Sequence, residues 1–337
     1  MTKKRKILRR VLALIGVILT LATCTGCNSL STYKSLVRHD EPILMPPRKI
    51  PATPPEKGVR ITYFGTNSYL LQSREGSVLV DPYFSRLGPL ITTKLPGAKA
   101  IPNRKRIDEG LAILPPKADL ILITHAHFDH LLDTPIVAEK TQAEHVILSR
   151  TGAFQAEHAG LPAGKVIEAA DGKRIEWKGI VITPYLTDHG RVGSKVPWPG
   201  TRPEEPKSTD HITDWLLGEP MGYLVEMGGK RIFINSGGKE TCKLPPPSFA
   251  PVDLGIIGVP SKDCVTLFTP TVERIKPGIV IPSHQDNFGR PLSKGFKFLI
   301  FFNQASDMPG VLRQWKAMGR EEKDLLLLDY YQPWTLQ

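Results

Sequence analysis

The chain has 337 residues, of which 41% are hydrophobic and 23% are charged, and we find no low-complexity tract or internal repeat in it. This is the composition of a folded globular protein that buries a substantial core, in one large domain or two ordinary ones. The formal net charge is +11, but six Lys and Arg residues lie within residues 1–26, which contain no acid, so that +5 remains for the rest. No basic helix and no nucleic-acid module accompanies this charge, and we therefore expect no nucleic-acid partner.

The N-terminus has the pattern of a targeting segment. A basic stretch, "MTKKRKILRR", precedes 13 apolar or small residues, "VLALIGVILTLAT". A run of this length is shorter than the roughly 20 residues that span a bilayer and fits the apolar region of a signal peptide. The following "CTGC" resembles the cleavage box of bacterial lipoproteins, with Cys27 as the lipidated residue and Cys24 as the alternative. A plain cleaved signal or a short uncleaved anchor is also open.

The predicted elements begin after this segment. Residues 1–26 are predicted to be the signal peptide, residues 27–56 a proline-rich tether, and residues 57–337 the folded domain. Apolar alternation predicts strands within residues 59–73, interrupted at Gly65-Thr66-Asn67, and within residues 76–84, ending at Asp81. Residues 86–117 are loop-like with a short helix at 107–114. A buried strand is expected at 118–124.

The second half alternates helices and strands. Pro135 opens a predicted helix at 134–141, and Gly228-Gly229 is the expected turn of a hairpin over 222–238. Further strands are expected at 145–149, within 173–186, and at 253–259, 278–284 and 324–331; further helices are expected at 151–160, 269–276 and 307–319. The order of these elements predicts an α/β layered fold in which helices cover sheets.

The segment "THAHFDH", residues 124–130, concentrates potential metal ligands directly after a buried strand. His125 and His127 project to the same side of an extended segment and can reach one ion. Asp129 and His130 come a step later and can face a second ion. Imidazole and carboxylate are the donors that suit zinc and similar divalent metals. Asp133 follows at the start of the next helix, where it is expected to cap that helix or to support the ligands.

These residues resemble the signature of the metallo-β-lactamase superfamily. The resemblance continues with Asp81 in "VLVDP", His189 in "LTDHG" and His284 in "PSHQDNF", in the order of that family's motifs. It implies a four-layer αβ/βα sandwich. "THAHFDHLLDTP" and "PSHQDNF" look closest to the broad branch that includes N-acyl-phosphatidylethanolamine phospholipase D.

The resemblance also implies a metal site. His125, His127 and His189 would hold a first ion, and Asp129, His130 and His284 a second, with zinc expected and iron or manganese as alternatives. Asp129 would also orient the attacking hydroxide, and Asp81 would support the metal loop. Asp286, which follows His284, could contact the substrate or brace that ligand. The chain departs from the family pattern at Gly238, where a carboxylate usually bridges the two metals. This departure leaves the number of ions, one or two, open.

The expected function is that of an exported, lipid-anchored, metal-dependent hydrolase. Its metal-bound hydroxide would attack an ester-type bond of a small-molecule or lipid substrate, such as a phosphodiester or a phospholipid. The N-terminal lipid would hold it at a membrane surface of the bacterial cell envelope, and Asn28 favours the outer membrane. The alternatives are a metal-binding scaffold that lost turnover with the bridging carboxylate and a structural envelope lipoprotein. Cys242 and Cys264 could form a disulfide or remain thiols, and the polar loop with Asp210 and His211 could shape the substrate pocket or lie on the surface.

Overall fold

The computed structural model describes residues 49–88, 95, 97–192, 194–238, 243–297 and 308–337. The predicted signal peptide, Cys24, Cys27, and the tether up to residue 48 lie outside these ranges. In the described part of the chain no helix is long and apolar enough to cross a membrane. The last residues before the domain, from Lys49 onward, include Ile50, which is buried and donates its backbone N–H to the carbonyl of Ile113.

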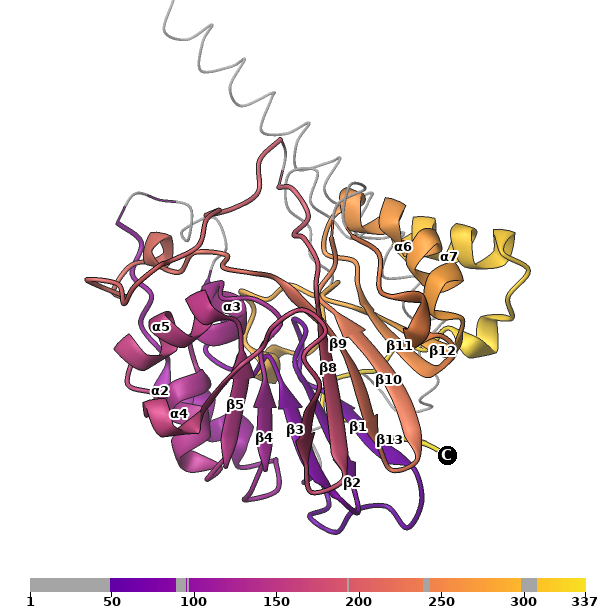
Figure 1. Ribbon diagram of the computed structural model, residues 1–337, viewed down its shortest axis with the longest axis horizontal. Coiled ribbons are helices and arrows are strands. Elements are labelled where there is room, and N and C mark those ends of the chain that lie inside the picture. Colours follow the sequence, from indigo (N-terminus) through magenta and orange to yellow (C-terminus); the bar gives the residue numbers. More distant parts are fainter. Residues whose placement is uncertain (1–48, 89–94, 96, 193, 239–242, 298–307) are drawn as a thin grey trace, which may run out of the picture.

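Two mixed sheets form the centre of the molecule (Figure 1). In the described residues the first sheet has seven strands in the order β13-β1-β2-β3-β4-β5-β6 and the second has six in the order β12-β11-β10-β9-β8-β7. The strands of the first are β1 Val59–Tyr63, β2 Tyr69–Ser73, β3 Gly76–Val80, β4 Leu120–Leu122, β5 His145–Leu148, β6 Val166–Glu168 and β13 Trp334–Leu336; those of the second are β7 Ile175–Trp177, β8 Ile180–Leu186, β9 Met221–Met227, β10 Lys230–Asn235, β11 Val252–Gly258 and β12 Pro277–Ser283.

Helices cover the outer faces of both sheets, which gives the predicted α/β sandwich. Figure 1 shows α2, α4 and α5 gathered on one side and α6 and α7 on the other. Within the described ranges the helices are α2 Arg104–Leu111, α3 Phe128–Leu131, α4 Thr134–Lys140, α5 Arg150–His158, α6 Lys262–Ile275 and α7 Met308–Ala317. Short 3-10 turns lie at η2 Ala163–Lys165, η3 Ile212–Asp214, η4 Pro247–Phe249, η5 Leu292–Lys294 and η6 Glu322–Asp324.

The parallel half of the first sheet explains why β4 is apolar throughout. β3, β4 and β5 run parallel, and Leu120, Ile121 and Leu122 are fully buried because both faces of the sheet are covered. Parallel strands place their C-terminal ends at one edge, so that Asp81 after β3 and the histidines after β4 emerge together. Ligands of α/β proteins bind at this edge.

The two sheets are joined at the same edge. Met221, at the start of β9, donates its N–H to the carbonyl of Thr124 at 2.7 Å. The hydroxyl of Tyr223 donates to the carbonyl of Ile123 at 2.6 Å. The residues directly before His125 are therefore hydrogen-bonded to the second sheet, and this fixes the ligand segment relative to both sheets.

Two predicted elements differ in the structure. The predicted strand at 324–331 is not formed; Leu325 and Tyr330 make only isolated bridges, to Val280 and Tyr63, and the strand that follows is β13. The leucines of this segment are buried as core residues, which gives a continuous apolar run without a ladder. The helix predicted at 269–276 begins earlier, at Lys262, and continues through Pro270.

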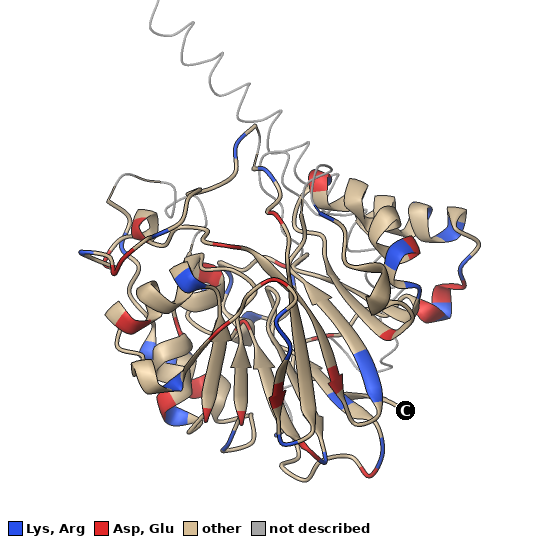
Figure 2. Ribbon diagram, in the orientation of Figure 1, with Lys and Arg blue, Asp and Glu red and all other residues tan. Residues whose placement is uncertain are grey.

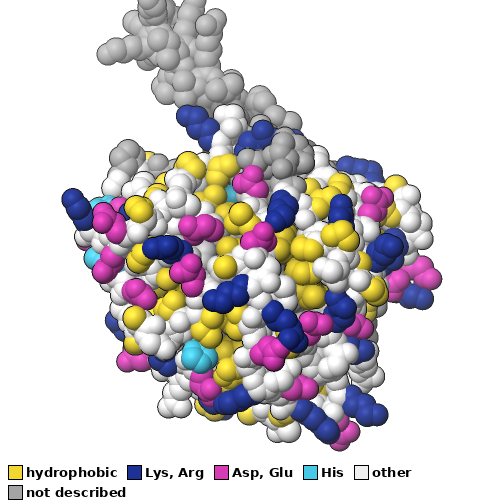
Figure 3. Space-filling view, in the orientation of Figure 1, with side chains coloured by type: hydrophobic (Ala, Val, Ile, Leu, Met, Phe, Trp, Pro, Cys, Tyr) yellow, Lys and Arg dark blue, Asp and Glu magenta, His cyan; other side chains and the backbone are white. Residues whose placement is uncertain are grey.

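Charges of both signs are mixed over the face that Figure 3 shows. Lys and Arg alternate with Asp and Glu on the helices and strand ends (Figure 2), and both signs lie among apolar side chains in the space-filling view (Figure 3). On this face, therefore, the net positive charge of the chain is not gathered into one basic area.

Candidate metal centre

The potential ligands come from the ends of three strands. His125 and His127 follow β4, and His127 is the residue before α3, which carries Asp129 and His130. His189 follows β8 and His284 follows β12. Among the described residues, this brings together two groups whose donor atoms lie within 4.8 Å of one another, namely His125, His127 and His189, and Asp129, His130 and His284.

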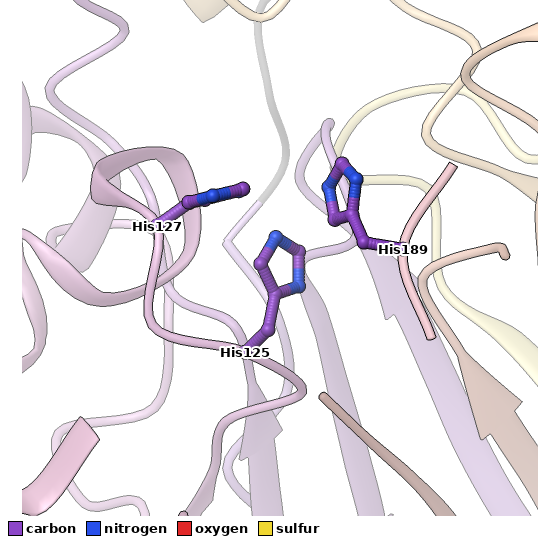
Figure 4. A group of neighbouring side chains, drawn as sticks. All are labelled: His125, His127 and His189. Carbon is purple, nitrogen blue, oxygen red and sulfur yellow. The ribbon is translucent and has the colours of Figure 1, made fainter. Parts of the chain in front are cut away.

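The three histidines of the first group face one another (Figure 4). His127 donates from Nε2 to the carbonyl of Pro197 at 3.0 Å, and His189 donates from Nδ1 to the carbonyl of Gly190 at 2.6 Å. A neutral imidazole that donates from one nitrogen carries a lone pair on the other. The free lone pairs are thus on Nδ1 of His127 and Nε2 of His189.

His125 completes this group. Its Nδ1 lies 3.2 Å from the hydroxyl of Ser236 and 3.3 Å from that of Thr124. Its Nε2 is buried and has no hydrogen-bond partner in the described part of the chain. Buried polar atoms are normally paired, and an atom left without a partner beside two other free lone pairs fits a metal ligand.

The donor atoms of the second group lie closer together. Nε2 of His130 is 3.2 Å from Nε2 of His284, and Oδ2 of Asp129 is 3.7 Å and 3.6 Å from these two atoms. Tetrahedral zinc at its usual bond lengths sets donor atoms roughly 3.3 Å apart. His130 donates from Nδ1 to Asp81 at 2.9 Å, so that its Nε2 presents a lone pair to this point. At these distances the lone pairs of the three donor atoms repel one another. A cation bound among them would attract all three and remove this repulsion.

Burial sets the protonation of these side chains. It lowers the pKa of His125 well below the ordinary value, that of His127 to about 3, and that of His189 to about 4. Burial also acts to raise the pKa of Asp129, but His130 and His284 outweigh it and hold that pKa below the ordinary range. Neutral imidazoles and an ionised carboxylate are the states that bind metal.

The carboxylate of Asp81 is hydrogen-bonded to the ligand segment at several points. Besides His130, its carboxylate accepts bonds from the N–H of Thr124 at 2.7 Å, the hydroxyl of Thr124 at 2.6 Å and the amide of Asn67 at 2.9 Å. The charge of Asp81 raises the pKa of His130 in spite of burial, which acts to lower it. This carboxylate–imidazole pair fixes the ring orientation and directs Nε2 of His130 to the second group.

Comparison with known proteins gives the family. Residues 60–284, more than half of the chain, match the family described as "Beta-lactamase superfamily domain". The chain belongs to this superfamily. It is similar to a UPF0173 protein of Pyrococcus abyssi, at 26% identity over 250 residues that cover 71% of this chain and 89% of the relative. It is also similar to a UPF0173 metal-dependent hydrolase of Polynucleobacter asymbioticus, at 26% identity over 73% of this chain and 80% of the relative.

The fold has a solved counterpart in Igni18, a metallo hydrolase of the archaeon Ignicoccus hospitalis. The TM-score is 0.55, and the alignment covers 83% of this chain and 98% of Igni18 at 16% sequence identity. The sandwich of two mixed sheets is therefore the metallo-β-lactamase fold. With its family and relatives, this chain is a metal-dependent hydrolase of that superfamily.

In this hydrolase Asp133 does not have the capping role that its position predicts. It is the residue before α4, but its side chain makes no capping hydrogen bond. Its carboxylate instead accepts bonds from the backbone of Phe84 at 2.7 Å and of Ser85 at 2.6 Å, and from the Ser85 hydroxyl. Burial raises its pKa to about 6. Asp133 therefore ties α4 to the loop after Asp81.

The region of Gly238 contains the smallest side chains of the site. Ser236 contacts His125, whereas Asn235 accepts a bond from the N–H of Gly258 and faces the sheet. Two further residues that the sequence offers as partial substitutes for the missing bridging carboxylate, Glu240 and Cys242, lie outside the described residues. Cys264 is a buried free thiol, and burial raises its pKa to about 11. No carboxylate from β10 joins either ligand group within the described ranges.

The segment after His189 forms one wall of the site. The ring of Trp198 lies 5.7 Å from those of His127 and Phe128. Asp210 and His211 are not in either ligand group; they pair with residues 98–100 through backbone hydrogen bonds. Trp198 and the buried Arg86 were not predicted as functional residues from the sequence, because neither lies in a local pattern of ligands.

Proposed function

We propose that the six side chains of the two groups hold two divalent cations and that this centre hydrolyses an anionic ester, in particular a phosphodiester or a phospholipid. The observation that carries the proposal is the convergence of free lone pairs in two adjoining groups, whose His125 and His130 rings have centroids 3.9 Å apart. Five imidazoles and one carboxylate suit zinc, and iron or manganese accept the same donors.

When bound, such cations would polarise the ester oxygen and lower the pKa of a water molecule toward neutrality. The chain's own residues orient this chemistry. Asp129 is the single carboxylate among the six donors and is ionised, so it can align the attacking water by accepting a hydrogen bond from it. Trp198 and Phe128 shield the His127 side of the centre from solvent.

The charge of the donor set supports an anionic substrate. Five donors are imidazoles, and only Asp129 contributes a negative charge. Two divalent cations would exceed this charge, and an anionic oxygen of the substrate would balance them. Gly238 adds no carboxylate to balance the charge of the two cations, so the anionic oxygen of the substrate would do so.

The test compares bis(p-nitrophenyl) phosphate with p-nitrophenyl acetate as substrates of the zinc-loaded protein. We expect faster hydrolysis of the diester, two metal equivalents by elemental analysis, and loss of both activity and one equivalent in His127→Ala. His158→Ala is the matched control, because His158 is paired with Glu205 at the surface. Two equivalents without turnover of either substrate would favour the second candidate, a metal-binding scaffold, for which Gly238 is the supporting observation.

We further propose that Cys27 carries a lipid that holds the exported domain at the cell envelope, with the outer membrane favoured. The basic and apolar residues before "CTGC" support this. Cys27→Ser should move the protein from the membrane fraction to the soluble fraction and abolish labelling by radioactive palmitate, whereas Cys24→Ser should not. The opposite pattern would assign the lipid to Cys24.

A further inference from the structure

A buried ion pair lies behind His284, outside both ligand groups. Arg86, in the loop after β3, and Asp286, two residues after His284, are both fully buried and form a charge-assisted hydrogen bond. A buried charge is costly unless it is paired and its other donors and acceptors are satisfied. The pair is therefore stable in this position only because neighbouring groups form hydrogen bonds with both charged side chains.

Arg86 fastens the loop that follows His284. Besides Asp286, its guanidinium donates to the carbonyl of Asn287 at 2.9 Å and to that of Arg290 at 3.0 Å. A third nitrogen donates to the hydroxyl of Thr66 at 3.0 Å. One side chain thus connects the loop after β12 with the turn between β1 and β2.

Asp286 is hydrogen-bonded to the backbone of the same turn. Its Oδ1 accepts the N–H of Thr66 at 2.7 Å, and the carbonyl of Thr66 accepts the N–H of His284 at 2.8 Å. The backbone of His284 is held in this way at φ +58°, a conformation that non-glycine residues keep only where the surroundings determine it. The backbone of His284 is thus fixed through Thr66 and not by the sheet alone.

Two tyrosines, one in β1 and one in the segment before β13, complete this network. The hydroxyl of Tyr330 donates to Oδ2 of Asp286 at 2.5 Å, and the hydroxyl of Tyr63 in β1 lies 3.2 Å from Oδ1. Gly65 leaves the space for the pair: a Cβ there would lie 2.4 Å from Nη1 of Arg86 and 2.7 Å from Oδ2 of Asp286. The family match ends at residue 284, so both Asp286 and Tyr330 lie beyond it.

We infer that Arg86, Asp286 and Tyr330 are positioning residues for His284, and that the C-terminal segment thereby controls how tightly the second ligand group binds its metal ion. The inference rests on the proposed two-ion site. His125, His127 and His189 have other supports, namely Ser236, Pro197 and Gly190. Disturbing the ion pair should therefore lower the affinity of the second ligand group for its ion and leave the affinity of the first group unchanged.

The experiment titrates the zinc-loaded full-length chain with a chelator and measures the metal retained by elemental analysis. We expect Asp286→Asn to lower the affinity for one metal equivalent about 10- to 100-fold, which is the usual effect of changing a residue that orients a ligand. Tyr330→Phe removes one hydroxyl, is the gentler change for folding, and should weaken the same equivalent several-fold. Tyr331→Phe is the matched control, because the neighbouring Tyr331 hydroxyl makes no hydrogen bond to Arg86 or Asp286.

A second measurement follows the backbone of His284 in the metal-free protein. Hydrogen exchange of the peptide that covers residue 284 should accelerate in Tyr330→Phe and not in Tyr331→Phe, because the bond from His284 to Thr66 is loosened. This reading holds whatever number of ions binds, so failure of the two-ion proposal and failure of the positioning role are distinguishable. Unchanged exchange in Tyr330→Phe, or equal weakening of both equivalents, would overturn the inference.

Discussion

Asp81 and His130 lie 49 residues apart in the chain, and their carboxylate and imidazole are hydrogen-bonded at 2.9 Å. The same carboxylate accepts two bonds from Thr124, directly before the first histidine of the site. One side chain at the end of β3 thus fixes both the start of the ligand segment and a ring of the second ligand group.

Asp81→Asn should lower the affinity of the second ligand group for its metal ion. An amide carries no charge and cannot accept all of the bonds that the carboxylate accepts, so that His130 loses its orientation. We expect about a 10- to 100-fold loss of affinity for one equivalent and a loss of about 1–3 kcal/mol in the free energy of unfolding, from unpaired buried groups. Chelator titration and urea unfolding measure the two effects. Asp108→Asn, at an exposed pair with Lys140, should change neither.

Gln155→Leu should act on the other ion. The side chain of Gln155 donates to the carbonyl of Ala126, between His125 and His127, at 2.8 Å and accepts the N–H of Leu216 at 2.9 Å. Without these two hydrogen bonds the ligand segment would be less firmly held. We therefore expect the affinity of the first ligand group for its ion to fall about 10-fold. Gln314→Leu is the control, because Gln314 makes comparable bonds between α6 and α7. It should lower the melting temperature without changing metal affinity; a change of affinity in both variants would indicate a general loosening.

The stability of the metal-free protein should fall as the pH is lowered from about 6.5 to about 4. Burial depresses the pKa values of His125, His127 and His189 in the folded state, so the unfolded chain binds more protons in this range and acid favours it. The pKa of His130 is raised, so that its contribution is fully present below pH 6.5 and does not oppose this trend. The pKa of Asp133 is raised to about 6, so this carboxyl takes up its proton first in the folded state and offsets part of the loss that the three histidines cause. Each depressed histidine contributes up to about 1.4 kcal/mol per pH unit. Urea unfolding at several pH values measures the slope, which His127→Gln should reduce; a flat profile would contradict the assignment.

Removal of metal should destabilise the protein to a degree that depends on the free metal concentration. An ion at a concentration of about 1,000 times its dissociation constant adds about 4 kcal/mol to the free energy of unfolding, because it binds the folded state. Differential scanning calorimetry with and without chelator should show this difference, and added zinc should restore it. His127→Ala should show a smaller shift, since it retains only the second ligand group. A melting temperature that is independent of chelator would contradict metal binding by the folded chain.

The sequence was sufficient to predict the ligand segment because its ligands are consecutive and follow an apolar strand. His125, His127, Asp129 and His130 have a spacing that is visible without a fold. Asp133 was expected to cap its helix or to support the ligands. It makes no capping hydrogen bond, and its partners, Phe84 and Ser85, lie in a loop that only the sheet brings near. The pairing of Arg86 with Asp286 joins residues 200 positions apart and leaves no local pattern.

The strand predicted at 324–331 was wrong for a related physical reason. Four leucines followed by Asp-Tyr-Tyr resemble a buried strand, but their burial comes from packing between β12 and β1 rather than from a ladder. Burial alone does not distinguish the two cases when the run is short.

Tyr330 has a further consequence, because it follows the carboxylate that it supports, Asp286, by 44 residues. A chain emerging from the ribosome exposes its N-terminal portion first, so Asp286 emerges before this partner. Loading of the second ion would then depend on synthesis beyond Tyr330: a product truncated before that residue would have a weakened metal site without any change in the ligands themselves.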